Sequence, residues 1–177
     1  SWMYELLKDK ASPDVLNLFS YTGGASIVCA KAGARVTHVD SAKSVNEWAG
    51  INVEYSNITK GSVRFIEEDA VKFIKREERR KKKYQGIIID PPTFGRGNKG
   101  EVWKIERDFS SLLHSCQKIL AKDASFLLVT SHSPGITSGV LRVLLAGFEG
   151  KLEFGEMILK GKESHSLLPV GVYARLI

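Results

Sequence analysis

The segment Asp90-Pro91-Pro92-Thr93-Phe94 places an acid and two prolines directly after the apolar run Gly86-Ile87-Ile88-Ile89. The β-branched run predicts a buried parallel strand that ends at the acid. The prolines exclude a helix and remove two backbone donors, which leaves their carbonyl groups free to accept hydrogen bonds. A stiff group of acceptors at a strand end suits a flat ligand that carries donors, such as an exocyclic amine. We therefore expect Asp90, Pro91 and Pro92 to orient the acceptor of a reaction, although the same residue types also occur in ordinary loops.

A small polar turn follows another apolar segment, Val15-Leu16-Asn17-Leu18. Glycines in such a turn allow the backbone to approach a ligand closely, and the N–H groups at the start of the next helix then face outward. The turn lacks the three spaced glycines of the dinucleotide-binding fingerprint. We expect a ligand-binding role for its residues, which are Phe19, Ser20, Tyr21, Thr22, Gly23 and Gly24.

Acidic residues also end the next two apolar segments. Asp40, with the adjoining Ser41, follows Arg35-Val36-Thr37-His38-Val39, and Asp69, with Ala70, follows a third strand-like segment. Nucleotide-binding folds place a carboxylate on the ribose hydroxyls about 20 residues after the first turn, and open α/β sheets bind ligands at the carboxyl ends of their strands. Asp69 alone is equally typical of a helix N-cap. Because no glycine-rich triphosphate loop with its Lys-Ser/Thr is present, the set favours a sulfonium nucleoside over a nucleotide.

These residues must be positioned by alternating strands and helices. Patterning predicts strands near residues 14–19, 35–40, 62–67, 86–90 and 125–130, with helices near 24–33, 42–56, 69–82, 103–121 and 136–147. The segments 151–160 and 171–177 are expected to form two final strands, as a hairpin. This order predicts an α/β fold in which helices cover both faces of a doubly wound, mainly parallel sheet. The glycine-containing stretch 93–102 is expected to be a mobile flap on the substrate side.

Composition agrees with one compact domain. At 177 residues and 43% hydrophobic, the chain can bury a core without disulfides or a metal, and no metal site is expected. Its two cysteines, Cys29 and Cys116, fall in helical stretches, which suits a reduced, cytoplasmic protein. No apolar run approaches the roughly 18 residues of a membrane span, so membrane insertion is not expected.

The net charge of +6 favours a polyanionic partner such as RNA. The densest basic run, 75–83, is typical of a solvated helix end whose cations offset the helix dipole, and this interpretation is favoured over direct RNA contact. Arg96, Lys99 and Lys104 are fewer but lie next to the Asp-Pro-Pro-Thr-Phe segment, where they would meet phosphates. Phe94 either stacks on a base or packs inward as an anchor of its loop.

The segments 17–24, 37–40, Asp69-Ala70 and 90–94 together resemble the cofactor and substrate motifs of class I S-adenosylmethionine-dependent methyltransferases. Within that superfamily, 18–24 and 90–94 resemble the bacterial large-subunit (23S) ribosomal RNA methyltransferases that act on cytosine C5 or guanine N7. The resemblance extends from about Val15 to Ile177. It implies a seven-stranded, Rossmann-like sheet with an antiparallel last strand, and S-adenosylmethionine as cofactor, with S-adenosylhomocysteine as product.

The same resemblance implies roles for individual residues. Asp40 would hold the ribose, Asp69 with Ala70 the adenine edge, and the turn 19–24 the methionine part. Ser41 and Asp90 are also expected to contact the cofactor. Methylation at cytosine C5 uses a cysteine that attacks C6, and in the C5 enzymes this cysteine follows the fifth strand. The matching place here reads Thr130-Ser131-His132-Ser133-Pro134 without a cysteine, so a base nitrogen is the favoured acceptor. His132 there either contacts the substrate or caps the next helix and lines the cleft.

The ribosomal members carry an additional N-terminal RNA-binding portion, whereas this sequence begins close to its first predicted strand. Residues 1–13 are interpreted as the tail of a preceding element or a linker, and 14–177 as the catalytic domain. A catalytic fragment of a longer protein is favoured over a core that recognises its substrate alone. The sequence thus predicts a methyltransferase acting on a base of ribosomal RNA. A small-molecule or protein methyltransferase of the same fold ranks second. A third alternative, a non-catalytic RNA-binding relative, is disfavoured because such a protein would have no reason to keep Asp40, Asp69 and Asp90 together.

Overall fold

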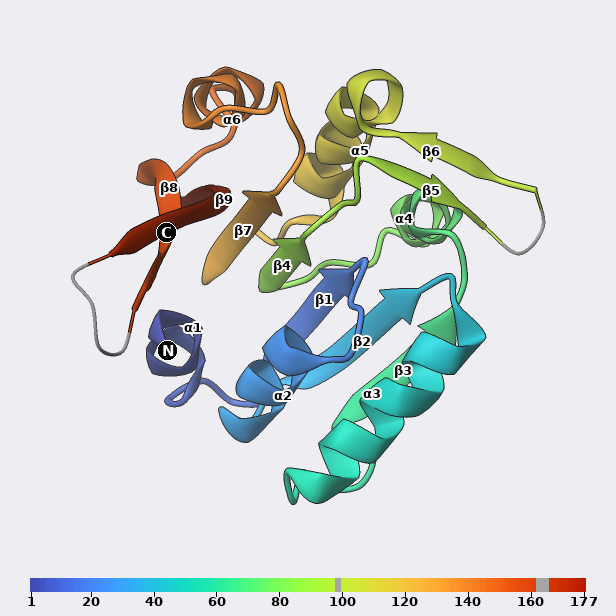
Figure 1. Ribbon diagram of the computed structural model, residues 1–177. Helices are drawn as coiled ribbons and strands as arrows, with labels where there is room; N and C mark the ends of the chain where they lie inside the picture. The colour runs from blue at the N-terminus through green and yellow to red at the C-terminus, as the bar shows by residue number, and fades with distance from the viewer. Residues whose placement is uncertain (98–99, 162–165) are drawn as a thin grey trace.

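The computed structural model describes residues 1–97, 100–161 and 166–177, in which a seven-stranded sheet lies between two layers of helices (Figure 1). The strand order is β3-β2-β1-β4-β7-β9-β8. The strands of this sheet are β1 (Asp14–Leu18), β2 (Arg35–Asp40), β3 (Val63–Glu67), β4 (Gly86–Ile89), β7 (Phe126–Ser131), β8 (Leu152–Lys160) and β9 (Leu167–Leu176). The helices are α1 (Trp2–Leu7), α2 (Gly24–Lys31), α3 (Lys43–Tyr55), α4 (Ala70–Arg79), α5 (Ile105–Ile119) and α6 (Ser138–Leu144).

The pairing of the strands places their carboxyl ends at one edge. The pairs of β1 with β2 and β4, of β2 with β3, and of β4 with β7 are all parallel, whereas β9 is antiparallel to both β7 and β8. The predicted doubly wound, mainly parallel sheet with an antiparallel last strand is therefore confirmed. The turns that follow β1, β2, β3, β4 and β7 meet at the same edge, as the sequence motifs require.

The apolar side chains of the central strands pack against the helices on both faces of the sheet. In β4, Ile87 and Ile89 pack into the core beneath α4 and α5, whereas Ile88 packs into the core that α1 and α2 cover. Burial on both faces explains why these strands read as continuous apolar runs. The first residue of β4 must be small, because a Cβ built on Gly86 would lie 2.8 Å from the ring of Phe126.

The stretch 93–102, predicted to be a mobile flap, carries a short antiparallel hairpin, formed by β5 (Phe94–Arg96) and β6 (Val102–Lys104). Its mobility stays a prediction. Residues 98–99 lie outside the described ranges. The expected helix near 103–121 accordingly begins at Ile105. The cause is Trp103, which is 4% exposed and packs against Phe19 with ring centroids 5.0 Å apart. Its burial fixes the second arm of the hairpin on the domain.

Helix α1 packs against the domain that follows it. Met3 and Leu7 are buried in the core that α2 covers, and the ring of Trp2 meets Phe126 edge-on at 5.4 Å between centroids. The division into a linker at 1–13 and a catalytic domain at 14–177 stays a prediction. In the described ranges, every helix is too short or too polar to cross a membrane.

Candidate active site

Two adjoining hollows lie at the carboxyl ends of the strands, and Phe19, Asp40, Ser41 and Pro92 line both. The strand-end hollow, of about 350 Å³, is completed by Tyr21, Asp90, Pro91, Thr93, His132 and Ser133. The hairpin hollow, of about 70 Å³, is completed by Val39, Glu68, Asp69, Ala70, Gly95, Arg96, Gly97 and Trp103. Residues from five separate turns thus meet at one place.

The Asp40 carboxylate has a fixed orientation at the end of β2. The backbone N–H of Tyr21 donates to Oδ2 at 3.0 Å, and that of Ala42 donates to Oδ1 at 3.0 Å. A carboxylate has about four lone-pair sites, so about two remain for a ligand. The arrangement can accept hydrogen bonds from a pair of neighbouring hydroxyl groups.

The turn after β1 is built from unusual backbone conformations. Phe19 and Tyr21 have φ of 55° and 48°, and Gly23 has φ of 87°. Left-handed conformations at non-glycine residues cost about 1–3 kcal/mol each and cluster at functional sites. The Ser20 hydroxyl donates to the Asn17 carbonyl at 2.6 Å and accepts from the Val39 N–H at 3.0 Å. Ser20 therefore anchors the turn to β1 and β2, while Phe19 and Tyr21 line the hollows.

A buried polar chain supports the other end of this turn. Asn17 Nδ2 donates to Ser26 Oγ at 2.9 Å, and Ser26 Oγ lies 3.0 Å from His38 Nδ1. Burial lowers the pKa of His38 to about 4, so its ring is neutral at pH 7. A Cβ built on Gly23 would lie 3.5 Å from this ring and 3.3 Å from Ala49 Cβ. The positive φ and these close neighbours together favour glycine at position 23.

The other two turn residues are placed outside the hollows. The Thr22 carbonyl accepts from Asn52 Nδ2 of α3 at 2.9 Å, and Gly24 begins α2 with no atom within 4 Å of a built Cβ. The predicted six-residue set thus divides: two residues line the hollows, and four shape or support the turn. Direct contact of those four with a ligand stays a prediction.

Asp69 and Ala70 lie at the start of α4, beside the hairpin hollow. The Asp69 carboxylate accepts from the Lys72 N–H at 2.9 Å, so Asp69 is the helix N-cap. Ala70 is buried. Asp69 also lines the hairpin hollow, and the two interpretations of this residue are therefore compatible.

One sequence prediction about the Asp-Pro-Pro turn is wrong. The Pro92 carbonyl was expected to be free, but the indole N–H of Trp103 donates to it at 2.7 Å. The hairpin, which the sequence did not reveal, brings this donor across from β6. Pro92 is thereby held in place by Trp103, and its remaining neighbour Pro91 lines the strand-end hollow.

Asp90 is held in place by Thr130, near the end of β7, and by His132, just after that strand. The Thr130 hydroxyl donates to Asp90 Oδ1 at 2.6 Å, and His132 Nε2 lies 3.8 Å from the same oxygen. The carbonyl of Val170 can only accept, so its hydrogen bond to His132 assigns a proton to Nδ1 and turns Nε2 toward Asp90. The backbone of β9 approaches closely here, since a Cβ on Gly171 would lie 2.9 Å from His132 Nδ1.

Thr93 and Ser133 join the two loops that carry Asp90 and His132. Their hydroxyl oxygens lie 2.8 Å apart, so one donates to the other. The sequence motifs did not predict the hydrogen bonds that Thr93, Thr130, Ser133 and Trp103 make here. Thr130 and Ser133 could have been found from the sequence, because they lie close to His132 at the end of β7. Trp103 could have been placed only by recognising the hairpin.

Phe94 is 50% exposed on the hairpin, and the Arg96 guanidinium lies 5.9 Å from its ring centroid. The inward-packing alternative for Phe94 is therefore wrong, because Trp103 fills the anchoring position. Arg96 lines the hairpin hollow. Lys104 pairs with Phe94 across the hairpin, and its side chain is exposed. Lys99 lies outside the described residues.

Both cysteines lie away from the hollows. Cys29 of α2 and Cys116 of α5 are fully buried in the two cores, and burial raises the pKa of both thiols, that of Cys29 to about 12. Neither is available as a nucleophile. Within the described part of the chain, no three His, Cys, Asp or Glu side chains gather in a way that could hold a metal ion.

A family model described as S-adenosylmethionine-dependent methyltransferase matches residues 2–171. The chain belongs to this family. The methyltransferase is 35% identical over 126 residues to ribosomal RNA large subunit methyltransferase K/L of Shewanella frigidimarina, and 37% identical over 119 residues to the protein of that name from Shewanella amazonensis. These alignments cover 70% and 66% of the chain, but only 17% and 16% of the relatives.

Solved structures agree with the family. The S-adenosylmethionine-dependent methyltransferase of Agrobacterium tumefaciens superposes with a TM-score of 0.93 at 36% identity, over 99% of this chain and 59% of that one. The methyltransferase SMU.776, solved in complex with S-adenosylhomocysteine, superposes with a TM-score of 0.76 at 26% identity, over 99% of this chain and 48% of that one. The methyltransferase uses S-adenosylmethionine as its cofactor.

Proposed function

We propose that this methyltransferase methylates a nitrogen of a base in ribosomal RNA. The observation that carries the proposal is the position of Asp90. Its Oδ1 is held by Thr130 at 2.6 Å, and within the described residues its Oδ2 has no hydrogen-bond partner. Asp90 and Pro91 line the strand-end hollow together. The nature of the RNA is supported by the relatives, which are named ribosomal RNA large subunit methyltransferases.

The cofactor would lie along the rim that both hollows share. Asp40 would accept hydrogen bonds from the two ribose hydroxyls with its free lone pairs, and Ser41 adjoins it. The hairpin hollow beside Asp69 and Ala70 would receive the adenine, with apolar walls from Phe19 and Trp103. The methionine part would follow the turn that contains Tyr21. These assignments are supported by the fixed orientation of Asp40 and by the left-handed backbone of the turn.

Methyl transfer needs positioning more than acid–base chemistry. S-adenosylmethionine supplies, when bound, a methyl group that is already activated. Asp90 Oδ2 and the Pro91 carbonyl would accept N–H donors of the base and direct the lone pair of the acceptor nitrogen along the line of displacement. Alignment of this kind lowers the activation barrier by several kcal/mol, on the order of 7–11 kcal/mol at most. Asp90 need not be a strong base.

A nitrogen acceptor is favoured over cytosine C5 because carbon methylation requires a nucleophile. A cysteine is the group that would attack C6, yet Thr130, His132 and Ser133 surround Asp90, and both cysteines of the chain are buried in the cores. A ring nitrogen or an exocyclic amine carries its own lone pair. His132 and the exposed Phe94 and Arg96 would contact the RNA around the target base.

The relatives are much longer than this chain, which spans 17% of the first and 59% of the Agrobacterium tumefaciens structure. We extend the proposal to a longer protein in which an N-terminal portion contributes RNA binding. With ribosomal RNA as its substrate, the protein would act in the cytoplasm. The two cysteines in helical stretches suit such a reducing compartment.

The test is transfer of tritium from S-adenosyl-[methyl-³H]methionine to an unmodified transcript of large-subunit ribosomal RNA. Protein is titrated to concentrations at which the RNA is fully bound, so that weak binding does not hide turnover. We expect label in the RNA, reduced at least about 100-fold in Asp90→Asn and retained in Asp123→Asn, an exposed acid distant from the site. Label in a small molecule or a protein, or none in RNA that is fully bound, would contradict the proposal.

A further inference from the structure

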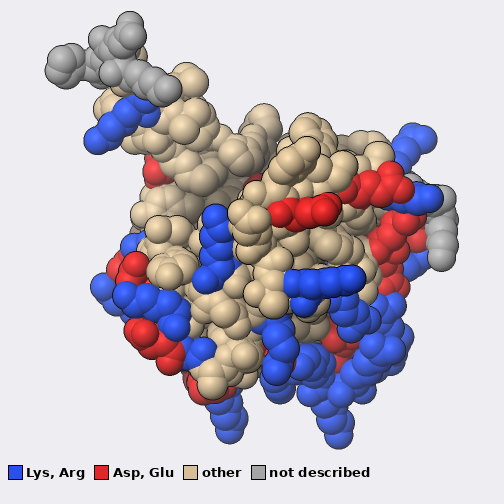
Figure 2. Space-filling view, turned by 90° about the horizontal axis from the view of Figure 1, so that it is seen from below, with Lys and Arg blue, Asp and Glu red and all other residues tan. Residues whose placement is uncertain are grey.

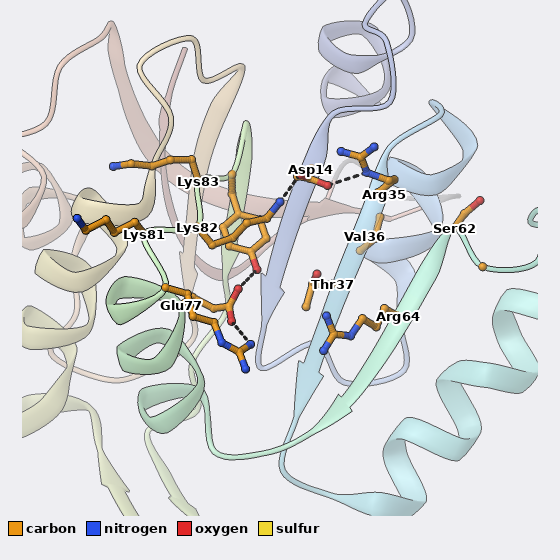
Figure 3. A pocket seen from close by; sticks show the side chains of 13 residues that line it. Asp14, Arg35, Val36, Thr37, Ser62, Arg64, Glu77, Lys81, Lys82 and Lys83 are labelled. Carbon is orange, nitrogen blue, oxygen red and sulfur yellow. Dashed lines mark hydrogen bonds and ion pairs between the residues drawn. The ribbon is translucent and has the colours of Figure 1, made fainter.

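A third and larger hollow, of about 740 Å³, lies at the opposite edge of the sheet (Figure 3). Its walls come from the beginnings of β1 and β2, from the end of α4 and from the loop that follows α4. We call it the basic hollow, after its cations Arg35, Arg64, Arg80, Lys81, Lys82 and Lys83. Arg35 of this hollow and Asp40 of the active site lie at opposite ends of β2, about 17 Å apart at roughly 3.3 Å per residue. The basic hollow is therefore distinct from the active site.

Cations outnumber acids in the basic hollow. Its lining includes six Lys or Arg side chains and two acids, Asp14 and Glu77, which leaves a surplus of four positive charges. Asp14 accepts from Arg35 Nε at 2.8 Å and from Lys82 Nζ at 2.5 Å. Each acid is thus already engaged, and the surplus charge is available to an anion.

Glu77, the second acid of the basic hollow, is also already engaged by its neighbours. It accepts from Tyr84 Oη at 2.8 Å and from Arg80 at 3.2 Å. Arg64 reaches toward this pair from β3 (Figure 3). Among the described residues, the guanidinium of Arg64 has no ion-pair or hydrogen-bond partner.

The loop after α4 carries a lysine at a position that suits glycine. The Lys81 and Lys82 N–H groups donate to the carbonyls of Glu78 at 3.0 Å and Glu77 at 3.1 Å, and Lys81 has φ of 54°. This is a Schellman ending, in which the left-handed residue is usually glycine. Glycine would relieve the backbone strain but would remove a cation from the rim of the basic hollow.

Neutralisation of the helix dipole explains only part of this arrangement. Cations at the C-terminal end of α4 are expected on that ground. Arg35 and Arg64, however, come from β2 and β3, and they line the same hollow from the other side. On the face shown in Figure 2, Lys and Arg side chains gather at the lower right, whereas acidic side chains lie higher up on the right and at the lower left.

We propose that the basic hollow binds phosphates of a second RNA segment, on the side of the domain away from the target base. Arginine guanidinium groups bind phosphate in a bidentate manner, and lysine adds point charges. Lys82 reaches across the hollow to Asp14, while Lys81 and Lys83 extend from its rim in another direction (Figure 3). An extended polyanion would meet both sets, whereas a single small anion would meet one. The proposal rests on the proposed RNA substrate.

Phosphate contacts of this kind position the RNA without reading its sequence. The test is fluorescence anisotropy with a fluorescein-labelled single-stranded RNA of mixed sequence, at several salt concentrations. In the triple variant Arg64→Gln/Lys81→Gln/Lys83→Gln we expect RNA affinity to fall about tenfold or more, and the slope of log K against log salt to decrease by about 2. Affinity for S-adenosylhomocysteine should stay unchanged, which shows that the variant is folded.

A matched triple variant removes the same net charge elsewhere. Lys31→Gln, Arg142→Gln and Lys151→Gln lie on α2, on α6 and before β8. We expect RNA affinity in this control to change by less than about threefold. Equal losses in both triple variants would overturn the proposal, because they would show a response to net charge alone.

Two further outcomes separate this proposal from the proposed function. If the wild-type chain binds no RNA but binds S-adenosylhomocysteine, the RNA substrate itself is wrong and the proposal fails with it. If RNA binds and is methylated equally well by both triple variants, only the basic hollow is wrong. If ATP displaces RNA from the control but has no site on the triple variant, the hollow binds a phosphorylated small molecule instead.

Discussion

Asp40→Asn isolates the contribution of one carboxylate oxygen to cofactor binding. The two oxygens of Asp40 each accept one backbone N–H, from Tyr21 and from Ala42, both at 3.0 Å. These two bonds leave about two lone-pair sites for the ribose hydroxyls. The substitution keeps the shape of the side chain but replaces one acceptor by an NH₂ group. That group must face either a backbone donor or a ribose hydroxyl, so at least one hydrogen bond to a charged acceptor is lost.

The expected loss follows from that one bond. A hydrogen bond to a charged group contributes about 1.5–3 kcal/mol. Since each 1.4 kcal/mol changes a dissociation constant tenfold, the Kd for S-adenosylhomocysteine should rise by about 10- to 150-fold. The effect on folding should be smaller, because Tyr21 is exposed and its N–H can bind water instead.

Calorimetric titration with S-adenosylhomocysteine measures this change directly. Glu67→Gln is the matched control: Glu67 pairs with Asp40 across β2 and β3, is exposed, and carries the same charge. It does not line either hollow of the active site. Its Kd should stay within about threefold of wild type, as expected for a screened surface charge. An unchanged Kd in Asp40→Asn, or equal increases in both variants, would refute the assignment of Asp40 to the ribose.

Four other changes test separate parts of the structure. Asp90→Asn should lower kcat at least about 100-fold in single-turnover methylation while changing the Kd of S-adenosylhomocysteine by less than about threefold; parallel losses would assign Asp90 to the cofactor. Gly171→Ala should lower the free energy of unfolding by about 1–3 kcal/mol and lower kcat, because the new Cβ would lie 2.9 Å from His132 Nδ1; thermal unfolding and kinetics check both. His38 has a pKa lowered to about 4 by burial, so the unfolded chain binds its proton first as pH falls, and about 3 kcal/mol of stability present above pH 6.5 should be lost toward pH 4; urea unfolding of His38→Gln should show a weaker pH dependence. Lys81→Gly should raise the free energy of unfolding by about 0.5–1 kcal/mol, since glycine adopts the left-handed conformation without strain, and a loss in urea unfolding would contradict the cost assigned to φ of 54°.

The sheet and its active edge could be predicted because they depend on short-range patterns. Runs such as Gly86–Ile89 are apolar throughout because both faces of the sheet are covered. An acid at or just after the end of β2, β3 and β4 marks the exposed edge. Parallel pairing then places Asp40, Asp69 and Asp90 together without any knowledge of side-chain contacts. The antiparallel position of β9 came from the family resemblance and not from the patterning.

The hairpin and the contacts around Asp90 could not be predicted in the same way. β5 and β6 have three residues each, too few for an alternating pattern, and Trp103 is a helix-compatible residue whose burial depends on its contact with Phe19. The hydrogen bond from Thr130 to Asp90 joins residues 40 positions apart. The basic hollow likewise depends on β2, β3 and the end of α4 meeting, so the sequence alone favoured an ordinary helix end.

The site of methylation on the product tests the central claim most directly. Ribosomal RNA methylated by the chain is digested to nucleosides, and the products are separated and identified by mass spectrometry against methylated standards. We expect the new methyl group on a base nitrogen, as N7-methylguanosine or an N-methylated exocyclic amine. A product of 5-methylcytidine would contradict the proposed reaction, because Asp90 and its neighbours provide no nucleophile for attack on C6.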